Sequence, residues 1–189
     1  MVGVDEVGRG CLAGPLLVVA ARQIIALPDG VADSKLLSRY QRQKIYMLLK
    51  KTCQFGEGWV SATEIDERGL SGAMRLGVAR ALWAIGTKSE EEVVIDGRTN
   101  YAPPAFTRVS CVIRGDNSVK LISAASIHAK VRRDQFMVKL AFDYPAYGFE
   151  RHVGYDTPAH RSALKANGAL KQIHRMSFGP LKSLHRDKV

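Results

Sequence analysis

The stretch that decides the fold stands at the start of the chain and reads Val2-Gly3-Val4-Asp5-Glu6-Val7-Gly8-Arg9-Gly10. Residues 2–4 predict a short first strand, because two β-branched valines flank the glycine. Two carboxylates come directly after this strand, and a glycine-rich loop follows them. Functional sites gather at strand ends in α/β sheets, so this order predicts that the first strand brings Asp5 and Glu6 to a site.

Strands and helices alternate along the rest of the chain. Apolar and β-branched runs predict strands at residues 16–25, 58–62, 93–95 and 107–113. Capping signals and helical spacing of apolar residues predict helices from residue 38 to about 56, at 70–85, at 118–142 and at 158–167. Strands interleaved with helices indicate an α/β layered domain in which some early strands pair antiparallel.

The composition is that of one globular domain. The chain has 189 residues, of which 46% are hydrophobic and 24% charged. No apolar run approaches the ~20 residues that cross a bilayer, so we expect no membrane span. The first residues include carboxylates where a secretory signal needs an apolar stretch, so we expect a cytoplasmic protein. We also expect a monomer.

The charge balance favours a polyanionic partner. The chain has 28 Lys and Arg against 18 Asp and Glu, and 28 − 18 gives a net charge of +10. Excess cations attract phosphate backbones and release counterions on binding. The cysteines, Cys11, Cys53 and Cys111, are widely spaced and form no C-x-x-C pair, so we interpret them as small buried residues rather than zinc or redox sites.

Carboxylates fall at the ends of several predicted elements. Asp5 and Glu6 follow the first strand, Asp96 follows the strand at 93–95, and Asp116 precedes the helix at 118–142. Mg²⁺ and Mn²⁺ prefer oxygen ligands, and phosphodiester hydrolysis can use two such ions about 3.5–4 Å apart. The four residues together predict a divalent-metal site. Neighbours on a regular strand point to opposite faces, so the first strand must twist or end at Glu6 if both residues are to face it.

Asp134 is a rival for the fourth ligand. If residues 118–142 form one helix, Asp116 and Asp134 lie roughly 27 Å apart at ~1.5 Å per residue, so both cannot bind one pair of ions. Asp116 stands at the N-terminal end, where the helix dipole favours negative charge. Asp134 follows Lys130 by four residues, which is the spacing of an ordinary helical ion pair. We therefore predict Asp116.

With these residues in place, the sequence resembles the ribonuclease HII family over nearly its whole length. The segments that carry the resemblance are Gly3-Val4-Asp5-Glu6-Val7-Gly8-Arg9-Gly10, Ala32-Asp33-Ser34-Lys35-Leu36-Leu37-Ser38, Ile95-Asp96-Gly97, Gly115-Asp116, Ala124-Ala125-Ser126-Ile127-His128-Ala129-Lys130-Val131-Arg132-Arg133-Asp134, Tyr147-Gly148-Phe149, His152-Val153-Gly154-Tyr155 and His174-Arg175-Met176-Ser177-Phe178.

The resemblance implies a fold, an activity and a cofactor. The fold is RNase H-like: a central mixed five-stranded sheet flanked by helices, with a C-terminal helical extension. We expect one nuclease domain over residues 1–189, with a catalytic core to about residue 142 and a substrate-binding extension at about 143–189. The activity is endonucleolytic hydrolysis of RNA in RNA–DNA hybrids and nicking at ribonucleotides embedded in duplex DNA, leaving 3′-hydroxyl and 5′-phosphate ends. The cofactor is Mg²⁺ or Mn²⁺, two ions with substrate bound, held by Asp5, Glu6, Asp96 and Asp116.

The same resemblance gives substrate-reading roles to a loop and a tyrosine. The loop Gly8-Arg9-Gly10 senses the 2′-hydroxyl, which separates RNA from DNA, and glycine permits the close backbone approach this needs. Tyr155 packs against the sugar at the RNA–DNA junction. Phosphate-binding candidates are Ser126 and Lys130, which share a helix face at i,i+4 spacing, and Lys35.

Some positions depart from the family's usual pattern. Cys11 replaces a proline, Arg98 an asparagine, Val153 a lysine and Asp156 a glycine. These departures bear on substrate affinity and junction geometry rather than on the chemistry. Four histidines lack metal-ligand spacing, and we interpret them as structural or phosphate-side residues: His128, His152, His160 and His174.

Two other functions fit parts of the sequence. One is a different nuclease or strand-transfer enzyme on the same fold, which would share the carboxylates but cut all-DNA duplexes. The other is a non-catalytic nucleic-acid-binding protein, which the positive charge alone would permit. That protein would bind its substrate without metal and never cleave it.

Overall fold

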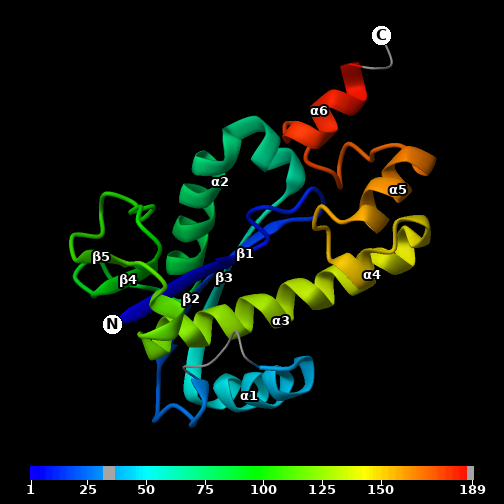
Figure 1. Cartoon of the computed structure of the whole chain (residues 1–189). Helices are drawn as coiled ribbons and strands as arrows, with labels where there is room; N and C mark the ends of the chain where they lie inside the picture. The colour runs from blue at the N-terminus through cyan, green and yellow to red at the C-terminus, as the bar shows by residue number, and fades with distance from the viewer. Residues whose placement is uncertain (32–36, 187–189) are drawn as a thin grey trace. The chain divides into compact units, whose positions relative to one another are not determined.

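The computed structural model describes residues 1–31 and 37–186 (Figure 1). By the contacts among its residues, the chain divides into two compact units. The first, called here the sheet unit, comprises Met1–Val7, Leu17–Trp59 and Met74–Val131. The second, called the loop unit, comprises Gly8–Leu16, Val60–Ala73 and Arg132–Val189. The expected division into a core to about residue 142 and an extension stays a prediction.

The predicted mixed five-stranded sheet is confirmed. Its strands are β1 Val2–Val7, β2 Leu16–Gln23, β3 Cys53–Val60, β4 Val93–Asp96 and β5 Val109–Val112, in the order β3-β2-β1-β4-β5. β1 pairs antiparallel with β2, whereas β4 runs parallel to both β1 and β5. The carboxyl ends of the three parallel strands β1, β4 and β5 therefore point the same way.

Helices cover the two faces of this sheet. The odd positions of β3, among them Cys53 and Phe55, pack in one apolar cluster with the first half of α3, Lys120–Asp143, and with α1, Arg39–Thr52. The even positions face the second half of α2, Ala62–Ala84. Because side chains alternate along a strand, α1 and α2 lie on opposite faces of the sheet, as Figure 1 shows.

The boundary between α1 and β3 differs from the expectation. Ser38 and Gln41 form the predicted capping box, but α1 ends at Thr52 and β3 begins at Cys53, so Gly56 is a strand residue rather than the end of a helix. The reason is tertiary: a Cβ on Gly56 would lie 2.1 Å from the Ala81 carbonyl oxygen. This glycine marks the close approach of α2 to β3, not a chain break.

Other boundaries differ as well. The strand expected to be short, β1, continues to Val7, while β2 ends two residues before residue 25 and β5 is shorter than residues 107–113. The helix expected at residues 70–85 begins earlier, at Ala62, and is kinked at Gly69, where φ is 66°. Its start has a capping box of its own, in which Ser61 and Glu64 exchange side-chain to backbone hydrogen bonds of 3.1 and 2.9 Å.

The loop unit has a separate apolar core. The residues that form it are Leu12, Ala13, Met137, Leu140, Tyr147, Phe149, Leu164 and Leu181. They come from the segment after the glycine loop, the second half of α3, and the short helices η3 Pro145–Tyr147, α4 Phe149–His152, α5 Pro158–Asn167 and α6 Gly179–Arg186. Among residues 1–31 and 37–186, no helix is both long and apolar enough to cross a membrane.

Candidate active site

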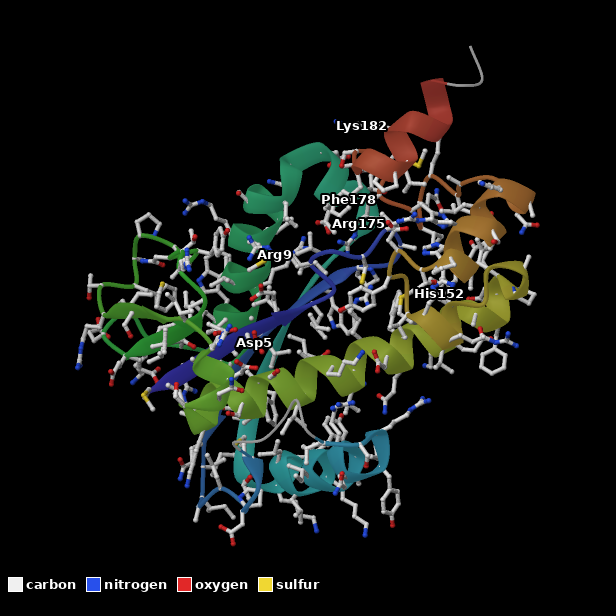
Figure 2. All side chains as sticks on the ribbon, in the orientation of Figure 1. Asp5, Arg9, His152, Arg175, Phe178 and Lys182 are labelled. Carbon is white, nitrogen blue, oxygen red and sulfur yellow. The ribbon has the colours of Figure 1, made fainter. Side chains whose placement is uncertain are left out.

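Asp5 lies near the end of β1, in the sheet unit (Figure 2). Glu6 is the next residue of the same strand. Asp5 is 6% exposed and Glu6 is partly exposed. The first strand was expected either to end at Glu6 or to twist, so that both carboxylates face one site. Because β1 continues to Val7, only the twist remains. The Glu6 N–H donates to the Asp5 carboxylate at 2.8 Å, which shows that the Asp5 side chain folds along the backbone toward its neighbour.

Asp96 stands beside the same strand end. The pairing of β1 with β4 stops at Val4 and Ile95, one residue before Asp5 and Asp96. The two parallel strands therefore end their hydrogen bonding where the carboxylates begin. Burial raises the pKa of Asp5 well above its usual value, and the negative charges of Glu6 and Asp96 raise it further. The structure thus brings three of the predicted carboxylates into electrostatic contact.

Asp116 joins the group through a turn. It lies in the 3-10 helix η2, Gly115–Asn117, just before α3, and is 2% exposed. The N–H of Gly115 donates to the Asp96 carboxylate at 2.7 Å, and the Ser123 hydroxyl donates to the Asp116 carbonyl at 2.5 Å. A Cβ on Gly115 would lie 3.5 Å from the Asp96 carboxylate and 2.6 Å from Ile122. Glycine at this position therefore lets the turn pack closely against Ile122.

The donor set suits a hard divalent cation. Its members are carboxylates, and their mutual repulsion raises the pKa of the buried Asp5, a cost that a cation between them would remove. Across the described ranges 1–31 and 37–186, no three His, Cys, Asp or Glu side chains stand in an arrangement that could hold an ion. Ion binding would therefore have to draw these side chains closer together.

Asp134 belongs to the other unit. It lies in the part of α3 that belongs to the loop unit, four residues after Lys130 in the sequence. The charge of Asp134 acts on Tyr155, where it contributes to a raised phenol pKa, whereas the pKa of Asp5 responds to Glu6 and Asp96. The choice of Asp116 over Asp134 as the fourth ligand stays a prediction.

The predicted phosphate-binding residues have mixed surroundings. Ser126 and Lys130 lie in α3, and both are half-buried. Ser126 lies near the Asp5 carboxylate and lowers the pKa of Asp5, which opposes the larger effect of burial. Lys35 lies outside the described residues.

The glycine loop belongs to the loop unit. Gly8 is buried with φ at 84°, and a Cβ there would lie 2.2 Å from Nε of Arg133. Arg9 and Gly10 are exposed, and a Cβ on Gly10 would meet nothing within 4 Å. The two glycines therefore differ: Gly8 is required by the protein's own packing, whereas Gly10 borders open space.

Tyr155 lies in the loop unit and is 40% exposed. Partial burial raises the pKa of its phenol, and the neighbouring Cys11 raises it further. The thiol of Cys11 lies 3.7 Å from the Val153 carbonyl oxygen. Two of the departures from the family pattern, Cys11 and Val153, are thus neighbours of the predicted junction-reading tyrosine, and Val153 is held at a φ of 43°, unusual for a β-branched residue.

The two other departures lie on the surface. Asp156 accepts two hydrogen bonds from Arg161, of 2.6 and 2.7 Å, and this pairing lowers the pKa of the Asp156 carboxyl. The negative charge that replaces the usual glycine is therefore balanced locally. Arg98 is exposed beside the end of β4.

The histidines are structural rather than arranged as ligands. His128 is buried, stacks on Phe55 with ring centroids 4.1 Å apart, and lies 2.8 Å from a Glu57 carboxylate oxygen. In the loop unit, His152 and His160 stack at 4.3 Å.

His160 and His174 form a chain of hydrogen bonds that ends at Tyr155. Leu170 N–H donates to Nδ1 of His174 at 3.0 Å, so the proton of this ring is on Nε2. That Nε2–H donates to Nε2 of His160 at 3.2 Å, and Nδ1–H of His160 donates to the Tyr155 carbonyl at 2.9 Å. Both rings are therefore neutral. Burial lowers their pKa values, that of His174 to about 4.

Two fully buried arginines were not predicted as site residues. Arg133 donates to the carbonyls of Pro15, Val153 and Ala13 at 2.8, 2.8 and 3.1 Å. Its guanidinium thus ties the segment after the glycine loop to the segment before Tyr155. In the sequence, Arg133 and Arg175 are marked only by their place in two of the segments that resemble the family. The residues around them there do not indicate a role.

Arg175 makes the second set of contacts. It donates twice to the Gly14 carbonyl, at 3.1 and 3.0 Å, and once to the Arg9 carbonyl, at 2.9 Å. In Figure 2 it lies beside Phe178, whose ring centroid is 5.2 Å from the guanidinium carbon. Burial lowers the pKa of Arg175 to about 10, so the side chain stays cationic at neutral pH.

The chain matches known proteins along nearly its full length. The family model described as ribonuclease HII matches residues 2–180. Ribonuclease HII of Thermosynechococcus vestitus is 45% identical over 188 residues, which cover 97% of this chain and 85% of that protein. Ribonuclease HII of Parvibaculum lavamentivorans is 44% identical over 186 residues, or 96% of this chain and 67% of that protein.

Solved structures agree with the sequence matches. Ribonuclease H2 of Pyrococcus horikoshii superposes with a TM-score of 0.79 at 26% identity, covering 98% of this chain and 97% of that one. The match from the PCNA:RNase HII complex of Archaeoglobus fulgidus has a TM-score of 0.78 at 25% identity, covering 94% of each chain. Bst-RNase HIII in complex with Mn²⁺ shares the fold, with a TM-score of 0.72 at 22% identity over 98% of this chain and 69% of that one.

The sheet order and these likenesses define a nuclease of the RNase H-like fold. Within that class, the chain belongs to the ribonuclease HII family. It is a hydrolytic endoribonuclease that acts on the RNA of RNA–DNA hybrids and depends on a divalent metal ion. Nicking at ribonucleotides within DNA is consistent with the family.

Proposed function

We propose that Asp5, Glu6, Asp96 and Asp116 hold two Mg²⁺ or Mn²⁺ ions and form the catalytic centre. The observation that carries the proposal is that Asp5, Glu6 and Asp96 stand where the pairing of the parallel strands β1 and β4 stops, and burial and the charges of Glu6 and Asp96 raise the pKa of Asp5 there. Carboxylates gathered at such a cost in free energy are typical of a site built for a cation. The turn that positions Asp116 supports the fourth ligand, because its Gly115 N–H is bonded to Asp96.

The bound ions would supply an activated water and charge stabilisation for the phosphate and the leaving oxygen. The side chains of the site determine where this happens. Water attacks phosphorus, the bond from phosphorus to the 3′ oxygen breaks, and the products carry a 3′-hydroxyl and a 5′-phosphate. Because a water molecule is the nucleophile, no covalent enzyme intermediate forms. Ser126, whose side chain lowers the pKa of Asp5, favours the ionised form of this ligand.

We assign recognition of the sugar to the loop unit. Gly8-Arg9-Gly10 senses the ribose 2′-hydroxyl, and the open space at Gly10 supports this because a sugar can approach the backbone there. Tyr155 is exposed enough to pack against a sugar at the RNA–DNA junction. Residues from about 143 onward serve as a substrate-binding extension, and Ser126, Lys130 and Lys35 contact phosphates. The protein acts as a cytoplasmic monomer.

Matched duplexes test the proposal. The protein is incubated with Mg²⁺ or Mn²⁺ and with duplexes of one sequence that contain zero, one or many ribonucleotides. We expect cleavage of the duplexes with one and with many ribonucleotides, products with 3′-hydroxyl ends, and no cleavage of the all-DNA duplex. Cleavage of all-DNA duplex would contradict recognition of the 2′-hydroxyl, and cleavage in EDTA would contradict the metal site.

A further inference from the structure

The peptide bond between Arg9 and Gly10 is held from one side only. Its carbonyl oxygen, on Arg9, accepts a 2.9 Å hydrogen bond from Nη1 of the buried Arg175. Its N–H, on Gly10, donates to no protein group among residues 1–31 and 37–186. In a trans peptide unit the C=O and the N–H point in opposite directions. Because the carbonyl faces a buried guanidinium, the Gly10 N–H points away from the protein interior.

The surroundings of Gly10 leave this donor accessible. Gly10 is exposed, and a Cβ built on it would meet no atom within 4 Å. An N–H at such a place can donate to an oxygen of a ligand that lies against the loop. The guanidinium also polarises the peptide unit, since a carbonyl that accepts a charge-assisted hydrogen bond makes its own N–H a better donor.

Arg175 is itself held in a fixed position. Its backbone N–H donates to the Leu12 carbonyl at 2.8 Å, and its Nε and Nη2 both donate to Gly14. The next two residues are anchored by Asp66, whose carboxylate accepts from the N–H groups of Met176 and Ser177 at 2.8 and 2.9 Å. A side chain held by so many contacts fixes the plane of the peptide that it touches.

We propose that Arg175 is a positioning residue for ribonucleotide recognition: by holding the Arg9 carbonyl, it presents the Gly10 N–H as the donor to the 2′-oxygen of the ribose. This inference rests on the proposed role of the Gly8-Arg9-Gly10 loop. It adds the buried residue that orients the backbone of this loop. Arg133, although equally buried, donates to the carbonyls of Pro15, Val153 and Ala13 instead and is not assigned this role.

The test compares the affinities for two duplexes. Dissociation constants are measured in Mg²⁺ for a duplex with one ribonucleotide and for the same duplex in DNA, in an Asp5→Asn background that suppresses cleavage. The quantity of interest is the ratio of the DNA constant to the ribonucleotide constant. A general structural defect weakens both complexes and leaves this ratio unchanged, whereas loss of a donor to the 2′-oxygen lowers the ratio alone.

Two changes remove the proposed donor arrangement. Arg175→Met deletes the hydrogen bonds and keeps a buried stem. The second change replaces the Arg9–Gly10 amide by an ester, which removes only the Gly10 N–H. Because residue 11 is a cysteine, a synthetic segment of residues 1–10 can be joined to residues 11–189 by native chemical ligation. We expect either change to lower the ratio about threefold to tenfold, the effect of one net hydrogen bond, with DNA affinity within twofold.

Leu164→Ala serves as the control, because Leu164 lies in the core of the same unit and its truncation destabilises without touching the loop. It should leave the ratio unchanged. If the unaltered protein prefers the ribonucleotide duplex but neither change lowers the ratio, this inference is wrong and the proposed function stands. An effect of the ester without an effect of Arg175→Met would overturn the role of Arg175. A ratio of one in the unaltered protein would overturn the loop's role and this inference together.

Discussion

Asp5 is a residue at which activity and stability oppose each other. Its pKa is raised, first by burial and then by Glu6 and Asp96, so the folded protein binds a proton at Asp5 more tightly than the unfolded chain does. Ionisation of Asp5 therefore destabilises the fold as the pH rises above the unfolded pKa near 3.9. At neutral pH and without metal, a neutral side chain at this position should be the more stable one.

We predict that Asp5→Asn nearly abolishes cleavage yet stabilises the metal-free protein. Asparagine keeps the Oδ1 acceptor for the Glu6 N–H and removes the buried charge. In EDTA at pH 7 we expect a gain of about 1 kcal/mol, or roughly 2–4 °C in melting temperature for a chain of this size. Calorimetry and a cleavage assay check the two effects. A metal-free Asp5→Asn protein that melts below the unaltered protein would contradict the electrostatic account.

Asp116 and Asp134 provide a matched pair of carboxylates. Asp116 is bonded into the turn beside Asp96, whereas the charge of Asp134 acts on Tyr155. We predict that Asp116→Asn lowers metal-dependent turnover by at least tenfold more than Asp134→Asn does. Both variants are compared at equal folded fraction, measured by circular dichroism, with Mn²⁺ titrated in each. The reverse order would show that Asp134 is the fourth ligand.

At the scale of elements, the glycine loop contains two glycines with different constraints. A Cβ at Gly8 would collide with Arg133 at 2.2 Å, whereas a Cβ at Gly10 meets open space. Gly8→Ala should therefore lower the melting temperature for two reasons. The added methyl group displaces the buried guanidinium of Arg133, and alanine is strained at the positive φ of Gly8. Gly10→Val should leave the melting temperature within about 2 °C but lower cleavage at a ribonucleotide at least tenfold, because the added side chain occupies the space of the sugar. Normal cleavage by Gly10→Val would show that the ribose does not lie against this part of the loop.

The histidine pair that supports the Tyr155 segment predicts a loss of stability in acid. The pKa values of His160 and His174 are lowered, so the unfolded chain binds more protons than the folded protein between about pH 4 and 6.5. Stability therefore falls as the pH drops through this window. For His174 the limit is about 3 kcal/mol, at about 1.4 kcal/mol per pKa unit. Urea unfolding of the unaltered protein and of His174→Gln from pH 4 to 7 measures the effect. Equal pH slopes in the two proteins would contradict it.

The sequence predicted the elements whose signals are local. The capping box at Ser38, the strand ending at Asp96 and the helix at residues 158–167 depend on neighbours in the chain, and each is confirmed. Gly56 was misinterpreted because the contact that requires glycine there is with the Ala81 carbonyl, 25 residues away in the sequence. The buried Arg175 was missed because it binds backbone carbonyls, and any sequence can supply those. The carboxylates could be predicted as a site because metal ligands require particular residue types, and their role as ligands stays a prediction.

For the whole molecule, the excess of positive charge predicts how binding responds to salt. The chain has a net charge of +10, and each phosphate that Lys or Arg neutralises releases condensed counterions from the duplex. We predict a steep linear fall of the logarithm of the association constant with the logarithm of salt concentration, alike for hybrid and DNA duplexes, because phosphate contacts carry no information about the sugar. Lys130→Ala should weaken both complexes similarly and reduce the slope by about 1. Fluorescence anisotropy from 50 to 300 mM salt measures the slope, with Lys88→Ala, on an exposed turn before β4, as the control. In the contrary outcome, Lys130→Ala leaves the slope unchanged and shifts the ratio of hybrid affinity to DNA affinity. That result would show that Lys130 contacts the sugar rather than a phosphate.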